Sequence, residues 1–131
     1  MSEYLKRKID KFLFDWKANP DRKPLIIKGA RQVGKTKSIK TFAEQNYESI
    51  VEINFAEDPV YKQIVENGYS AEAVIKNISR INPKARFIKG KTLIFFDEIQ
   101  EFPDIATSLK FFSLDGNYDV ICSGSLLGVH Y

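Results

Sequence analysis

The octet at positions 29–36, which reads GARQVGKT, constrains the fold of this chain more than any other stretch. It fits the pattern G-x-x-x-x-G-K-T, in which successive backbone N–H groups of a loop surround phosphate oxygens. The pattern is meaningful only between a strand and a helix. Residues 24–28 form a short apolar run typical of a buried strand, and residues 37–45 carry apolar side chains on one helical face. The sequence therefore predicts a strand, a phosphate-binding loop and a helix in succession.

The residue types of the octet suit a triphosphate. Gly29 and Gly34 allow a close approach of the backbone, Lys35 supplies a point charge to the β- and γ-phosphates, and the Thr36 hydroxyl suits Mg²⁺. The residues predicted to bind the nucleotide are Gly29, Ala30, Arg31, Gln32, Val33, Gly34, Lys35, Thr36 and Lys37. Taken alone, the octet also fits a glycine turn that precedes a basic helix.

Length and composition narrow the class of protein. The 131 residues predict a single domain over 1–131, with an amphipathic helix over 1–19 and a nucleotide-binding core over 24–131. The net charge of +3 comes from dispersed basic residues, so nucleic-acid binding is unsupported. One cysteine and one histidine exclude an internal disulfide and argue against a Cys/His metal site. Without a membrane-length apolar run or a signal peptide, the expected location is cytoplasmic.

Apolar patterns along the rest of the chain predict alternating helices and strands. The apolar stripe that ends in Phe12, Leu13 and Trp16 predicts that the first helix packs on the domain, in preference to an adenine-stacking role for its aromatic residues. A second strand is expected over 49–55, a helix from Asp58-Pro59 to Gly68, and a further short helix after Ser70. Later segments predict a strand over 92–96, a helix after Phe102 and a fourth strand over 118–122.

The strand over 92–96 delivers an acidic pair, Asp97-Glu98, to its carboxyl end. Ligands bind at the carboxyl edge of parallel sheets, which is also where the phosphate loop would lie. Asp97 is therefore predicted, with Thr36, to hold Mg²⁺, and Glu98 to polarise a water for attack on the γ-phosphate. The simpler alternative is that both acids cap the next segment or pair with lysines.

The alternation of helices and strands predicts an α/β fold, a three-layer P-loop NTPase core with a mostly parallel sheet.

Three segments together resemble the AAA-type ATPases of bacteria and archaea. These segments are the octet, the stretch LIFFDEIQ at 93–100 and the stretch CSGSLLG at 122–128. The similarity is greatest to the group of predicted ATP-binding proteins that join this module to a poorly understood C-terminal domain. The resemblance implies a polar sensor at the end of the fourth strand, for which Ser123 fits best and Ser125 second, with a local turn residue as the alternative. It also implies that Asn54 restrains Glu98, although an Asn tolerated at a strand end explains the residue as well.

The resemblance also implies parts that are not in this sequence. Such ATPases have a fifth strand beside the first, a helical lid, and an arginine that reaches a neighbouring subunit's nucleotide. The sequence is thus expected to be a truncated N-terminal ATPase module, lacking the fifth strand and lid, of a protein that forms homo-oligomers with an arginine supplied in trans or by the missing region. The strand over 25–28 would then lie at a sheet edge, which predicts self-association.

The predicted function is Mg-ATP binding, with ATP hydrolysis in the intact protein through Lys35, Glu98, Ser123 and Asn54. A non-hydrolysing nucleotide switch or assembly module remains the alternative, because the lid and the arginine supplied in trans are expected to be missing here. Such an arginine raises the rate of hydrolysis about 10³- to 10⁵-fold. A GTPase would carry an Asn-Lys-x-Asp segment, which this sequence lacks. A small-molecule kinase stays open, since its acceptor site needs no recognisable pattern.

Overall fold

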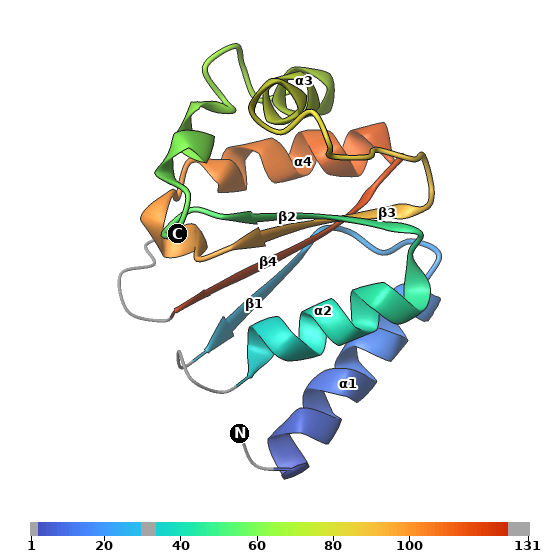
Figure 1. The fold of residues 1–131 in the computed structure, drawn as a ribbon. Coiled ribbons are helices and arrows are strands. Elements are labelled where there is room, and N and C mark those ends of the chain that lie inside the picture. Colours follow the sequence, from blue (N-terminus) through green and yellow to red (C-terminus); the bar gives the residue numbers. More distant parts are fainter. Residues whose placement is uncertain (1–2, 30–33, 126–131) are drawn as a thin grey trace.

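The computed structural model describes residues 3–29 and 34–125 as a sheet with helices on both faces (Figure 1). The strands are β1 (Leu25–Gly29), β2 (Ser49–Asn54), β3 (Thr92–Asp97) and β4 (Asp119–Ser125). The α-helices are α1 (Glu3–Ala18), α2 (Lys35–Asn46), α3 (Ala71–Ile81) and α4 (Ile105–Asp115). Two short 3₁₀ helices, η1 (Pro59–Gln63) and η2 (Ile99–Glu101), follow β2 and β3.

The described strands pair in the order β1-β4-β3-β2, and every pair is parallel. This sheet confirms the predicted α/β fold with a P-loop NTPase arrangement. Because all strands run the same way, their carboxyl ends meet at one edge of the sheet, where Gly29 pairs with Ser125 and Asn54 pairs with Asp97. Among the described strands, β1 lies at one edge of the sheet, as the sequence predicted.

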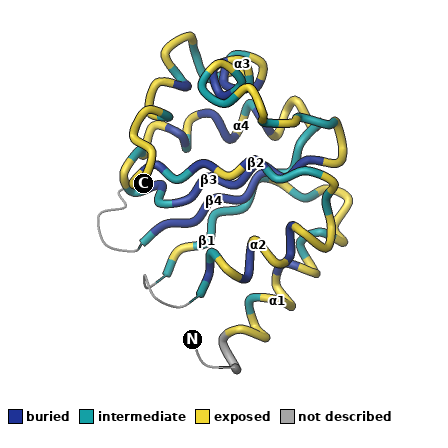
Figure 2. Tube along the Cα trace, viewed as in Figure 1, coloured by how far each residue is buried: buried dark blue, intermediate teal, exposed yellow. Residues whose placement is uncertain are grey.

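The apolar core consists of one cluster on each face of the sheet. Leu93 and Phe95 of β3 pack with α1 and α2, whereas Ile94 and Phe96 pack with α3 and α4. Alternate residues of a strand point to opposite faces, so a strand covered on both faces has no polar alternation. Every residue of β3 is buried, as are the five central residues of β4, and both strands are mostly dark blue in Figure 2.

The helix predicted from Asp58-Pro59 to Gly68 is wrong. Only η1 forms, and the segment continues as turns with successive i→i+3 hydrogen bonds, such as Ile64 N–H to the Tyr61 oxygen and Gly68 N–H to the Val65 oxygen. Five-residue η1 has no fully buried residue, and only Tyr61 among its residues packs against the core, so little apolar burial favours a longer α-helix.

Two further expectations need correction. The fourth strand does not end at Cys122 but continues to Ser125, because β1 supplies partners for Ser123, Gly124 and Ser125. In α1, Leu13 is fully buried and Trp16 packs near Phe42, but Phe12 is 54% exposed and is not among the residues that pack against the core.

Candidate functional site

The carboxyl edge of the sheet brings the two sequence motifs together. The Thr36 hydroxyl, at the start of α2, donates a hydrogen bond of 3.0 Å to Oδ2 of Asp97, at the end of β3. These residues are 61 positions apart in sequence. Their contact arises because β1 and β3 are parallel, so the loop after β1 and the acidic pair after β3 lie at the same edge.

Helix α2 is preceded by its N-cap residue Gly34, whose φ of 74° lies in the left-handed region that favours glycine. No side chain caps the amino end of α2. The first N–H groups of a helix have no partner within the helix, and together with the helix dipole they favour an anion. The local sequence therefore places a helix end that favours negative charge directly beside Lys35.

Lys35 is only 7% exposed, and its ammonium bridges the ends of two strands. Nζ donates to the carbonyl oxygen of Gly29 at 3.2 Å and to that of Gly124 at 2.8 Å. Burial lowers the pKa of Lys35, and the negative charges of Asp97 and Glu98 partly oppose this shift. The Lys35 ammonium is thus bound by two neutral carbonyl oxygens, and negatively charged oxygens would form stronger hydrogen bonds with it.

Asp97 is 4% exposed, and its two oxygens accept hydrogen bonds from neutral donors. Besides the Thr36 hydroxyl, the backbone N–H of Glu98 donates to Oδ1 at 2.8 Å. Burial raises the pKa of Asp97 above its usual value, and these hydrogen bonds only partly oppose the shift. A buried carboxylate next to a hydroxyl is a set of hard oxygen donors, which Mg²⁺ prefers.

Glu98 has a strained backbone. Its φ of 56° and ψ of 47° make it the one residue other than glycine with a positive φ in the described part of the chain. The left-handed region is unfavourable for a residue with a Cβ, and such strain is concentrated at functional sites. The turn directs η2 back toward β4, and Nε2 of Gln100 donates to Oε2 of Glu98 at 3.0 Å.

The polar residues predicted to assist catalysis lie at the same edge but have different neighbours. Ser123 is buried inside β4 and pairs with Ile27, so it is not a turn residue, whereas Ser125 ends the strand. The Asn54 side-chain oxygen accepts from the N–H groups of Ala56 and Glu57, each at 2.9 Å. Asn54 therefore orders the local turn after β2.

Two residues of this edge were missed by sequence reasoning. Gln100 contacts both Glu98 and the Ser125 backbone, and Gly124 lies against η2 without room for a side chain. Only weak signals in the sequence could have indicated them: a polar residue two positions after Glu98, and a glycine between two serines. The predicted ligands Ala30, Arg31, Gln32 and Val33 lie outside the described residues.

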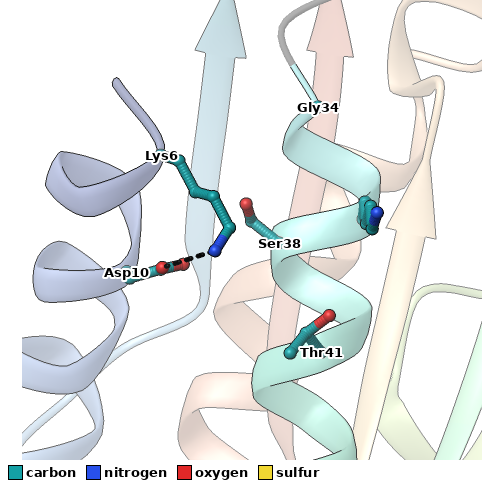
Figure 3. A pocket seen from close by; sticks show the side chains of 6 residues that line it. Lys6, Asp10, Gly34, Ser38 and Thr41 are labelled. Carbon is teal, nitrogen blue, oxygen red and sulfur yellow. Dashed lines mark ion pairs between the residues drawn. The ribbon is translucent and has the colours of Figure 1, made fainter. Parts of the chain in front are cut away.

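A cleft of about 370 Å³ opens beside the start of α2, between α1 and α2 (Figure 3). Gly34, Lys37 and Ser38 line it from the loop side, and Lys6 and Asp10 of α1, 4.0 Å apart, line it from the other. Trp16 lies elsewhere along α1, where its Nε1 donates to the Lys23 carbonyl oxygen at 2.8 Å. The preference for packing over adenine stacking thus agrees with the position of Trp16.

The described residues lack two kinds of feature. No group of three or more His, Cys, Asp or Glu side chains gathers into a metal cluster within 3–29 and 34–125. Over the same ranges, every helix is too short or too polar to cross a membrane.

Comparisons with known proteins agree with this geometry. A family model described as an AAA domain matches residues 21–130. The solved structure of PCH-2 from C. elegans is similar in fold, with a TM-score of 0.56 and 15% sequence identity. That match covers 96% of this chain and 38% of the PCH-2 chain, so this chain spans well under half the length of that protein. A comparison with curated proteins found no match.

Proposed function

The chain belongs to the AAA domain family as an AAA-type P-loop ATPase module, and we propose that it binds Mg-ATP and that the intact protein hydrolyses it. The observation that carries the proposal is the 3.0 Å contact between Thr36 and Asp97. It joins the phosphate-loop threonine to the acidic strand end, and this pair is what a magnesium-bound triphosphate requires.

Phosphate binding rests on Lys35 and the start of α2. The ammonium would exchange the carbonyl oxygens of Gly29 and Gly124 for β- and γ-phosphate oxygens, which offer full negative charge. The uncapped N–H groups of α2 would meet the same phosphates. The cleft between α1 and α2 adjoins Gly34 and Lys37 and is the proposed place for the nucleoside.

Thr36 and Asp97 would hold Mg²⁺, because the Thr36 hydroxyl donates its hydrogen to Asp97 and keeps its oxygen lone pairs for the cation. Few protein ligands suffice, because Mg²⁺ keeps several waters and takes oxygens from the substrate phosphates. When bound, the ion supplies positive charge against the charge that develops on the γ-phosphate.

Hydrolysis would use Glu98 to orient a water or accept its proton, while Lys35 and the loop amides stabilise the developing charge. Ser123 remains a hypothesis for contact with the γ-phosphate, and Ser125 is the second choice. Both follow the part of β4 whose Cys122 pairs with Phe96, so they lie near the acidic pair.

The test measures Mg-ATP binding by calorimetry and phosphate release by a continuous assay. Lys35→Ala is expected to abolish binding, whereas Glu98→Gln keeps binding and stops turnover. Lys40→Ala is the matched control, because Lys40 is an exposed lysine of the same helix that pairs with Glu52. If Lys35→Ala bound Mg-ATP as tightly as the unmodified chain, with an unchanged melting temperature, the assigned site would be wrong.

The same assay separates the enzyme from a non-hydrolysing switch. Steady phosphate release that disappears in Glu98→Gln supports hydrolysis. Nucleotide binding without any release, in the intact protein as well as in this chain, supports the switch or assembly module.

A further inference from the structure

A single peptide unit at the end of β4 lies between Lys35 and Gln100. The carbonyl oxygen of Gly124 accepts from Lys35 Nζ at 2.8 Å, and the N–H of Ser125 donates to Gln100 Oε1 at 3.1 Å. This carbonyl and this N–H belong to the same planar peptide group, so they move as one body. A change at the Lys35 ammonium is therefore felt directly at the Gln100 side chain.

The other end of the Gln100 amide reaches Glu98. Nε2 donates to Glu98 Oε2 at 3.0 Å. Three hydrogen bonds in series thus connect the ammonium of Lys35 to the carboxylate of Glu98 through one peptide and one side-chain amide. Consecutive hydrogen bonds of this kind polarise one another, so each depends on its neighbours.

Close packing keeps Gln100 against β4. A Cβ placed on Gly124 would come within 2.9 Å of Ile99 Cγ1 and 3.0 Å of Gln100 Oε1, so only glycine lets η2 approach this closely. The left-handed backbone of Glu98 turns the chain into η2 and sets the direction of approach. The contact is therefore held by backbone shape as well as by hydrogen bonds.

We propose that Gln100 is the positioning residue for Glu98, and that it makes the position of this carboxylate depend on where the Lys35 ammonium is bound. In the structure, Lys35 Nζ donates to the Gly124 carbonyl oxygen. When the ammonium turns to phosphate oxygens, the Gly124–Ser125 peptide loses that donor and Gln100 readjusts Glu98. This deepens the proposed function and rests on it, and it gives Gln100 the restraining role that the sequence suggested for Asn54.

The first test needs no nucleotide. In ¹⁵N-labelled protein, Gln100→Met identifies the Gln100 side-chain amide signals by their loss. Lys35→Met is expected to shift the signals of that amide and of the Ser125 N–H, whereas Lys40→Met leaves them in place. If Lys35→Met left both signals unmoved, the connection would be refuted, whatever the protein does with ATP.

The second test separates binding from turnover in the intact protein. Gln100→Met is expected to lower kcat roughly 10- to 100-fold, since small misplacements of a reacting group have effects of this size. The Mg-ATP dissociation constant should change by no more than about twofold, because Gln100 contacts Glu98 and the Ser125 backbone and is not proposed to contact the nucleotide. The control is Gln63→Met, at an exposed residue of η1.

A third variant divides the two ends of the amide. Gln100→Glu keeps an acceptor for the Ser125 N–H but places a carboxylate against Glu98, so kcat should fall as in Gln100→Met. Normal turnover in Gln100→Glu would overturn the positioning role. In the Glu98→Gln background, Gln100→Met should leave the melting temperature and Mg-ATP binding unchanged. A purely structural role for Gln100 would instead lower both. Absence of nucleotide binding in the unmodified protein would instead refute the proposed function, and the first test would still decide the connection.

Discussion

Two aspartates at opposite ends of neighbouring strands are treated very differently by this fold. Asp119, at the amino end of β4, is surrounded by charged and polar donors. Arg22 Nε lies 3.0 Å from each carboxylate oxygen, Tyr47 donates its hydroxyl to Oδ2 at 2.6 Å, and Lys17 Nζ lies 3.6 Å from the same oxygen. Asp97, at the carboxyl end of β3, accepts from the Thr36 hydroxyl and from one backbone N–H within the described residues.

The difference distinguishes a carboxylate that is paired with cationic side chains, Asp119, from one that accepts only neutral hydrogen bonds among the described residues, Asp97. Lys17 comes from α1, Arg22 from the loop before β1 and Tyr47 from the end of α2, so Asp119 ties that layer to the sheet. Burial and the bond to Asp119 raise the pKa of Tyr47, which therefore remains a hydrogen-bond donor. At the other edge, the ion pairs among the described residues do not include the carboxylate of Asp97.

The largest effect is expected from Asp119→Ala. Removing one member of a partly buried, hydrogen-bonded charge group leaves the others unpaired, so the free energy of unfolding should fall by about 2–4 kcal/mol. Urea unfolding measures the loss. Asp104→Ala is the control, because Asp104 is exposed and makes no capping hydrogen bond with its side chain. If both variants were equally stable, Asp119 would not be the structural anchor of this comparison.

Gly124→Ala tests the packing at the carboxyl edge and should have the next largest effect. The new Cβ would meet Ile99 Cγ1 at 2.9 Å, and such overpacking typically costs about 1–3 kcal/mol of stability. Gly29→Ala is the matched control, since its Cβ would be no closer than 3.6 Å to the side chain of Lys35. Thermal unfolding of both variants measures the difference. Equal melting temperatures would mean that η2 yields easily.

Local patterns predicted much of this fold, and long-range contacts explain what they missed. The apolar run of β3 and the octet are short stretches that carry their own signal, which is why the sheet and the pairing of motifs could be anticipated. Ser70 was likewise recognised as a helix cap and accepts from the Ala73 N–H at 3.1 Å.

The missed features depend on partners far away in sequence. The residues Ser-Gly-Ser at 123–125 look like a turn, but β1 extends the strand through them. Arg22 and Asp119 are 97 positions apart, and neither residue is unusual in its own segment. Gln100 gains its importance from the Ser125 backbone, 25 positions later. Such contacts follow from the strand order, which local patterns do not determine.

The strained turn at Glu98 gives a smaller effect with a distinctive sign. Glu98→Ala and Glu98→Gly both remove the side chain, but only glycine accepts φ of 56° without strain. The glycine variant should therefore be more stable than the alanine variant by about 1 kcal/mol. Chemical denaturation of the pair measures this. At a position with an ordinary backbone, the glycine variant is the less stable of the two. If Glu98→Gly were less stable than Glu98→Ala, backbone strain at Glu98 would not distinguish this edge of the sheet from the other.

The smallest effect is a pH dependence that belongs to Asp97. Burial raises its pKa in the folded state, so between the usual aspartate pKa and the raised value the folded protein binds a proton that the unfolded chain does not. The free energy of unfolding should therefore fall as pH rises through this window.

Asp97→Asn removes the titration while its amide can still donate to the Thr36 oxygen and accept from the Glu98 N–H. Without nucleotide, the stability advantage of Asp97→Asn over the unmodified chain should grow with pH and then level off, as measured by urea unfolding from acidic to neutral pH. The control is Asp104→Asn, a substitution of the same kind at an exposed carboxylate. A constant difference between Asp97→Asn and the unmodified chain at every pH would mean that the carboxylate of Asp97 is compensated in the folded protein, like that of Asp119, and the contrast between the two edges would be lost.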